Sequence, residues 1–104
     1  DEAIRNRGTP SLKHETPALA LQNQIGDLHR EVAGQRFGFL AALGKPGRIE
    51  RPFSKGTLAW GGLYGHTWFI DFARGLTVVA LTNTALEGCL GAYPGAIARA
   101  VYDV

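Results

Sequence analysis

Three apolar runs, separated by short links that contain glycine, constrain the fold of this 104-residue chain more than any other feature. The runs occupy residues 57–63, 67–71 and 76–83, and the link at 72–75 ends in Gly75. Glycine readily takes the positive φ that a longer β-hairpin link requires. The spacing therefore predicts three consecutive strands that pair as an antiparallel meander.

A glycine pair, Gly61-Gly62, lies inside the first run, between Trp60 and Leu63. Because glycine has no side chain, it leaves the backbone N–H and C=O groups accessible to another molecule. This pattern indicates a strand edge that faces a ligand. An alternative interpretation makes Trp60 a core aromatic residue and the glycine pair a β-bulge.

The remaining elements predict an α/β (α+β) fold with an antiparallel sheet of about four strands. A short helix is expected from Thr16, as N-cap, and Pro17 to about Asn23, and Gly26 would end it. Residues 37–43 read as a strand bounded by glycines, and residues 44–55 as a loop. A C-terminal helix is expected to open at Tyr93-Pro94, because apolar residues then recur at spacings of three and four.

We expect residues 1–104 to form a single unit. It would comprise a loop at 1–15, a helix, strand and loop at 16–55, and the meander with the C-terminal helix at 56–104. The run at 76–81 is apolar on both alternating faces, which is typical of a strand covered on both sides. Only the C-terminal helix is available as cover, so we expect apolar sheet surface to stay exposed in this chain.

Composition excludes several function classes. Eleven basic and nine acidic residues give a net charge of +2, which gives little support to nucleic-acid binding. The sequence contains no apolar run of about eighteen residues, so no transmembrane helix is expected. The single cysteine, Cys89, cannot form an intrachain disulfide and is expected to be a structural thiol, so the cellular compartment stays open. The histidines and Cys89 lack metal-ligand spacing, and we propose neither a metal nor a cofactor.

Short motifs in a fixed order carry a resemblance to a known family. They are NQ at 23–24, RFGF at 36–39, WGGLYGHTWFID at 60–71, GLTVV at 75–79 and TNTALEG at 82–88. In this order they resemble the C-terminal part of the serine β-lactamase superfamily. The resemblance is to the branch of class C-like β-lactamases, penicillin-binding proteins and family VIII-type carboxylesterases. It covers residues 15–104, and the absence of methionine agrees with a chain that continues upstream of Asp1.

The resemblance implies a Ser-Lys-Tyr acyl-transfer enzyme with a β-lactamase-like α/β domain. Its third sequence box, K-T-G in β-lactamases and W-x-G in some esterases, corresponds here to Trp60-Gly61-Gly62. The next residue, Leu63, would give its backbone N–H to the oxyanion hole. The same comparison makes Trp60, Gly61, Gly62 and His66 candidates for substrate binding, although a histidine that only pins the local backbone is an open alternative.

The nucleophile is absent from this chain, because no S-x-x-K motif occurs in it. The third box also lacks lysine, which favours ester or amide substrates over carboxylate-bearing β-lactams. We therefore expect the chain to be inactive alone and to need the missing N-terminal part, or a complementing chain, to act on a small acyl substrate. The alternative is a non-catalytic binding or self-association module that uses the exposed sheet.

Overall fold

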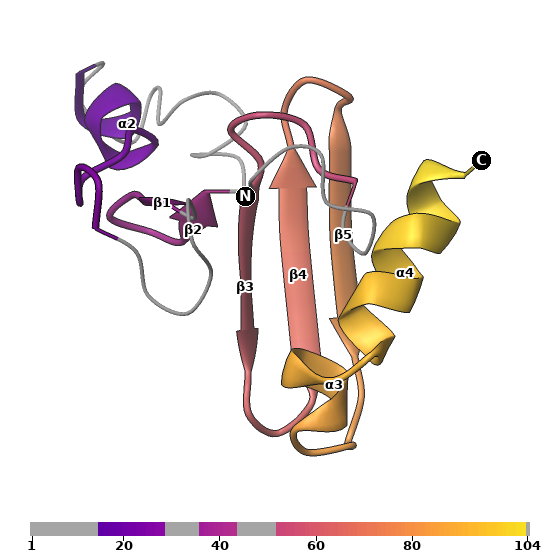
Figure 1. Cartoon of the computed structure of the whole chain (residues 1–104). Coiled ribbons are helices and arrows are strands. Elements are labelled where there is room, and N and C mark those ends of the chain that lie inside the picture. Colours follow the sequence, from indigo (N-terminus) through magenta and orange to yellow (C-terminus); the bar gives the residue numbers. More distant parts are fainter. Residues whose placement is uncertain (1–14, 29–35, 44–51, 104) are drawn as a thin grey trace.

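A computed structural model describes residues 15–28, 36–43 and 52–103 of the chain (Figure 1). The described elements are a short helix, five strands and two C-terminal helices, in this order: α2 Glu15–Ala20, β1 Arg36–Phe37, β2 Ala42–Leu43, β3 Leu58–Gly62, β4 His66–Asp71, β5 Leu76–Leu81, α3 Glu87–Leu90 and α4 Tyr93–Tyr102. The loops predicted at 1–15 and 44–55 lie mostly outside these residues. The fold class is α+β, as predicted.

The five strands form one antiparallel sheet in the order β1-β2-β3-β4-β5. Its centre is the predicted meander: β3 pairs with β4 from Leu58↔Ile70 to Gly62↔His66. β4 pairs with β5 from His66↔Leu81 to Asp71↔Leu76. In the link between β4 and β5, Gly75 has a φ of 66°, which is the conformation that the sequence predicts at this position.

The strand predicted at residues 37–43 is in fact a small hairpin of two strands, β1 and β2. The N–H of Gly38 donates to the carbonyl of Ala41 over 3.1 Å, which reverses the chain, and Arg36 pairs with Leu43. A Cβ at Gly38 would come within 2.5 Å of the carbonyl oxygen of Ala20, so the chain can turn against α2 only with glycine here. Within the described residues the sheet therefore has five strands, close to the four or so that the sequence predicts.

Helix α2 is shorter than predicted and begins earlier. Thr16 lies inside the helix instead of capping it, and the helix ends at Ala20 rather than near Asn23. The carbonyl of Ala20 accepts the N–H of Phe39 over 3.2 Å, so the β1–β2 hairpin takes an acceptor that a longer helix would use. Gly26, with a φ of 58°, lies in the turn that follows.

One face of the sheet packs against α4, which runs along β5 (Figure 1). The core on this face consists of Phe53, Phe69 and Ala98, with Val78 and Tyr102 against it. The rings of Phe53 and Phe69 lie 5.0 Å apart. Complete burial of one such side chain contributes about 1.5–3 kcal/mol, so this cluster anchors α4 to the meander.

The opposite face carries exposed apolar side chains. The register places Trp60, Trp68 and Val79 side by side across three strands, because directly paired residues lie on the same face. Val79 is 62% exposed and Leu81 78% exposed. The apolar surface expected from the pattern of β5 is therefore present.

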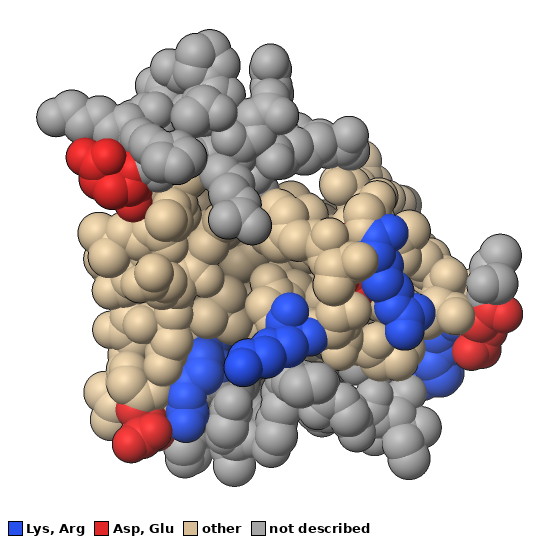
Figure 2. Space-filling view, turned by 90° about the horizontal axis from the view of Figure 1, so that it is seen from above, with Lys and Arg blue, Asp and Glu red and all other residues tan. Residues whose placement is uncertain are grey.

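Charged side chains of both signs appear on the face seen in Figure 2, where two basic side chains lie side by side and acidic ones lie near the edges. They do not gather into one basic patch there. Within the described residues, no helix has the length and apolar character needed to cross a bilayer.

Candidate functional site

The predicted third box forms the last three residues of β3. Trp60, Gly61 and Gly62 pair in unbroken register with Trp68, Thr67 and His66 of β4. The continuous register excludes a bulge at the glycine pair. Trp60 is 43% exposed and meets Phe37 edge to face at 5.5 Å, so it is a surface aromatic residue rather than a core one.

The β3–β4 link is a tight turn over residues 62–65. The N–H of Gly65 donates to the carbonyl of Gly62 over 2.9 Å. Gly65 has a φ of 114°, whereas neither Leu63 nor Tyr64 has a positive φ. Negative φ at both central residues, together with the bond from Gly65 to Gly62, fits a type I turn, and the following glycine at positive φ completes a three-residue hairpin loop.

This turn orients the backbone N–H of Leu63. A trans peptide is planar, so the Leu63 N–H points away from the Gly62 carbonyl that shares its peptide plane. That carbonyl faces inward to accept from Gly65, which directs the N–H of Leu63 outward. Outside the strand ladder, the described residues provide no hydrogen-bond acceptor for this N–H.

His66 begins β4 rather than lying in the turn, and its imidazole covers Gly62. A Cβ built at Gly62 would lie 2.0 Å from Cε1 of His66, so only glycine leaves room for the ring in this position. His66 is exposed and lies on the same face of the sheet as Trp60. The structure thus brings together four of the predicted site residues, Trp60, Gly62, Leu63 and His66. Gly61 pairs with Thr67 beside them, but its side-chain position faces the other side of the sheet.

The segment that follows β5, residues 82–88, holds the β3–β4 turn in place. Both the N–H and the hydroxyl of Thr82 donate to the carbonyl of Gly65, over 3.2 and 2.5 Å. The N–H of Leu86 donates to the carbonyl of Leu63 over 2.8 Å. Gly88 packs directly on Gly65, because a Cβ at Gly88 would come within 2.3 Å of the Gly65 oxygen. All three carbonyls at Gly62, Leu63 and Gly65 therefore have hydrogen-bond donors.

The motif at 82–88 contributes to the resemblance, but the sequence predicts no role for Thr82 or Leu86. For Thr82 the sequence gives a weak indication of such a role, since threonine side chains commonly bond to nearby backbone groups in turns. Leu86 had none, because its role uses only backbone atoms. The helix α3 that follows was also missed, and at four residues it is too short to give a periodic pattern.

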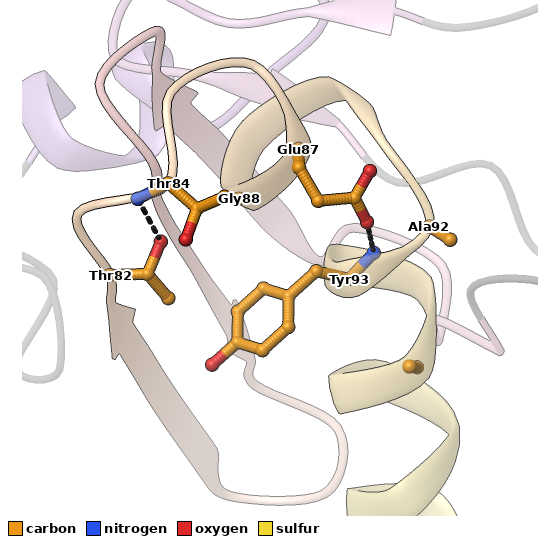
Figure 3. A pocket seen from close by; sticks show the side chains of 7 residues that line it. Thr82, Thr84, Glu87, Gly88, Ala92 and Tyr93 are labelled. Carbon is orange, nitrogen blue, oxygen red and sulfur yellow. Dashed lines mark hydrogen bonds between the residues drawn. The ribbon is translucent and has the colours of Figure 1, made fainter.

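A pocket of about 330 Å³ opens between the end of β5 and the helices α3 and α4 (Figure 3). The residues that line it are Thr82, Thr84, Glu87, Gly88, Ala92, Tyr93 and Ala96. Glu87 accepts the N–H of Tyr93 over 2.9 Å at its rim, as Figure 3 shows. None of the predicted site residues lines this pocket.

Cys89 packs against Gly61 of the third box, on the face of the sheet opposite Trp60. Its Sγ would be 3.0 Å from a Cβ at Gly61, so the thiol packs against the backbone of β3. Cys89 is partly buried. Among the described residues, no cluster of histidine, cysteine and carboxylate side chains has the arrangement of a metal site.

A buried carboxylate fixes the far end of β4. Asp71 is fully buried and accepts the hydroxyl of Tyr102 over 2.5 Å and the N–H groups of Ser54 and Arg74 over 3.2 and 3.1 Å. Burial raises the pKa of Asp71, but these hydrogen bonds outweigh burial and leave its pKa below the ordinary value. Burial, and then the Asp71 carboxylate, raise the pKa of Tyr102. This cluster ties α4 to the sheet but lies away from the predicted site.

Comparisons with known proteins found two similar hydrolases. The chain is 43% identical over 97% of its length to the esterase EstB of Burkholderia gladioli, of which it covers 26%. The solved structure of EstCE1, a hydrolase with promiscuous acyltransferase activity, matches with a TM-score of 0.82 at 42% identity. That match covers 97% of this chain and 27% of the EstCE1 chain. No protein-family profile matches the sequence.

The chain thus spans about a quarter of the length of the relatives it matches. Identity above 40% and a TM-score of 0.82 both refer to matches that cover 97% of the chain. In sequence and in fold, the chain fits the C-terminal part of the serine β-lactamase-like esterase family.

Proposed function

We propose that this chain supplies the third-box strand and one oxyanion N–H of a serine ester hydrolase, with Leu63 as the donor. A tetrahedral intermediate of acyl transfer develops negative charge on the former carbonyl oxygen, and preorganised N–H groups stabilise it. The observation that carries the proposal is the outward N–H of Leu63, oriented by the bond from Gly65 to Gly62. A donor that is already fixed costs no reorganisation when the charge develops.

The surroundings of Leu63 suit a small acyl substrate. Trp60, 43% exposed, and the imidazole of His66, which covers Gly62, lie on the same face of β3 and β4, and the Leu63 N–H follows directly after them. Aromatic surface beside accessible backbone groups is typical of a site that binds an uncharged ester. The absence of lysine from the third box removes the cation that a carboxylate-bearing β-lactam would meet.

The 104 residues carry no S-x-x-K motif, so the nucleophile and its base would come from the rest of a longer protein or from a complementing chain. The chain alone is then inactive. The test is to assay the purified chain on a p-nitrophenyl ester, alone and with the segment that carries S-x-x-K. Hydrolysis by the chain alone, abolished by a serine-directed covalent inhibitor, would contradict the proposal.

The donor itself has a sharp test, because proline removes the N–H and little else. Proline is favoured at the second position of a type I turn, and Gly62 before it is in an extended strand that proline tolerates. In the active protein that contains this chain, Leu63→Pro is expected to lower kcat about 100- to 1,000-fold, the effect of losing one oxyanion donor. Leu63→Ala is the matched control, since it shortens the exposed side chain but keeps the N–H.

A second function has one observation in its favour. Val79, 62% exposed, and Leu81, 78% exposed, leave an apolar strip on the face opposite α4, which suits a binding or self-association module. Light scattering separates the two functions. A stable dimer of the isolated chain that dissociates with Val79→Lys supports the module, whereas a monomer that binds the S-x-x-K segment supports the hydrolase.

A further inference from the structure

Leu86, whose N–H bonds to the carbonyl of the proposed oxyanion donor, has an unusual backbone conformation. Leu86 has φ 64° and ψ −58°, and no other non-glycine residue described has a positive φ. The N–H of Glu87 donates to the carbonyl of Ala85 over 2.8 Å. These angles and this bond between residues two apart define a γ-turn of the rare, strained form.

Burial of the side chain does not account for this strain. Leu86 is 59% exposed, so its side chain gains little from its position. The gain is in the backbone: the Leu86 carbonyl accepts the N–H of Leu90 over 2.6 Å, and the Leu86 N–H donates to Leu63 over 2.8 Å. Strained residues of this kind persist where their surroundings hold them and often mark functional sites.

The bond to Leu63 completes the immobilisation of the proposed donor. Gly65 fixes the peptide before Leu63 through the carbonyl of Gly62, and Leu86 fixes the peptide after it through the carbonyl of Leu63. With both flanking peptides held, the direction of the Leu63 N–H has little freedom. An oxyanion donor stabilises charge only if its direction is set before reaction, and a misplacement of 1 Å can cost about 100-fold in rate.

We propose that Leu86 is a positioning residue of the oxyanion strand: its γ-turn delivers the N–H that locks Leu63 in the direction needed for catalysis. This inference rests on the proposed function, because it assigns Leu86 to the same site. It predicts that the backbone conformation at residue 86 matters for the chemical step, whereas its side chain does not.

The test compares three substitutions at Leu86 in the active protein that contains this chain. Leu86→Gly adopts positive φ freely and keeps the N–H, so it should retain wild-type kcat. Leu86→Ala should do the same, since it removes only exposed side-chain atoms. Leu86→Ile cannot adopt positive φ without a severe clash, so the γ-turn should open and kcat should fall about 10- to 100-fold with KM unchanged.

The control for Leu86→Ile is Leu90→Ile, because Leu90 is also exposed, at 63%, but lies in the regular helix α3. A second readout is inhibition by an arylboronic acid, whose bound form mimics the tetrahedral intermediate. Leu86→Ile should raise the Ki of the boronate by the same factor by which it lowers kcat. A merely structural role would leave the ratio of Ki to KM unchanged.

The outcomes separate the inference from the proposed function. If Leu63→Pro lowers kcat while Leu86→Ile behaves like Leu90→Ile, the role of Leu86 is refuted and the oxyanion donor stands. If Leu63→Pro keeps wild-type kcat, the donor is refuted and the role of Leu86 falls with it. If Leu86→Ile does not fold, hydrogen exchange of the wild-type protein decides. Protection of the Leu86 amide supports the lock, since the residue is 59% exposed, and exchange at the rate of a free amide overturns it.

Discussion

The hydroxyl of Tyr102, in the last turn of α4, donates to Oδ2 of Asp71 at the end of β4 over 2.5 Å. The two residues are 31 positions apart in the sequence, and this bond closes α4 onto the sheet. The Tyr102 ring stacks on Phe69 at 5.9 Å, and the guanidinium of Arg74 lies 4.7 Å above its centre. One tyrosine therefore joins the helix to the core by an apolar contact and to the strand end by a polar one.

Tyr102→Phe should lower the free energy of unfolding by about 1–3 kcal/mol, because it keeps the stacked ring but leaves a buried carboxylate short of a donor. The Asp71 N–H partners, Ser54 and Arg74, remain and limit the loss. Urea unfolding measures the change. Tyr64→Phe is the control, since Tyr64 is 85% exposed, and an equal loss in both variants would show that the bond to Asp71 contributes nothing.

The same pair predicts how stability depends on pH. The folded pKa of Asp71 is lowered, so its contribution is present above the unfolded pKa of about 3.9 and is lost as the pH falls through the folded pKa. The folded pKa of Tyr102 is raised, so its contribution is present below the unfolded pKa of about 10 and is lost as the pH rises through the folded pKa.

Urea unfolding between pH 3 and pH 11 checks both limbs of this prediction. Asp71→Asn should flatten the acid limb, and Tyr102→Phe should flatten the alkaline limb. An acid limb as steep in Asp71→Asn as in the wild type would assign the acid sensitivity to other carboxylates.

Glu87 provides a cap for α4 from outside that helix. The N-cap position, Ala92, has no side-chain cap, and Oε1 of Glu87 accepts the N–H of Tyr93 over 2.9 Å. Glu87→Ala should destabilise the protein by about 0.5–2 kcal/mol, as does loss of an N-cap acceptor. Glu87→Gln keeps an acceptor oxygen and should lose only the helix-dipole part, about 0.3–1 kcal/mol.

Thermal unfolding of the two Glu87 variants ranks them. Glu15→Ala is the control, since Glu15 lies at the start of α2, far along the chain from α4. If Glu87→Ala and Glu15→Ala lose the same stability, the cap on α4 is not significant.

Much of the sheet is predictable because its signals are local. The apolar runs and Gly75 lie within 27 residues and directly indicate the meander, since glycine at the end of a link sets the hairpin. The Trp60-Gly61-Gly62 box is also local, and the structure places it at the end of β3. The short β1–β2 hairpin was missed because its turn depends on contact of Gly38 with α2, which no neighbouring residue encodes.

The support of the candidate site is less predictable because backbone atoms form most of it. The bonds from Leu86 to Leu63 and from Thr82 to Gly65 join segments about twenty residues apart, and a leucine at positive φ has no sequence signature. The partnership of Asp71 and Tyr102 is equally hidden, since each residue alone fits an ordinary strand end and helix end. Their pairing follows only when the packing of α4 on the sheet is known.

Among the residues that the structure describes, Thr82 is the one whose side chain hydrogen-bonds to the turn beside Leu63. Its hydroxyl donates to the Gly65 carbonyl over 2.5 Å and accepts the N–H of Thr84 over 3.3 Å. Thr82→Val keeps the shape of the residue but removes both bonds, so it should destabilise the protein by about 1 kcal/mol. In the active protein it should lower kcat less than Leu63→Pro, because the Thr82 N–H still holds Gly65 and the Leu63 N–H is retained.

The matched control is Thr82→Ser, which keeps the hydroxyl and loses only a methyl group. Urea unfolding and ester hydrolysis should both place Thr82→Ser between the wild type and Thr82→Val. If the serine variant is as slow as the valine variant, the methyl group rather than the hydrogen bond governs the turn. If neither variant changes kcat while both lose stability, the turn tolerates movement at Gly65, and the direction of the Leu63 N–H depends on Gly62 and Leu86 alone.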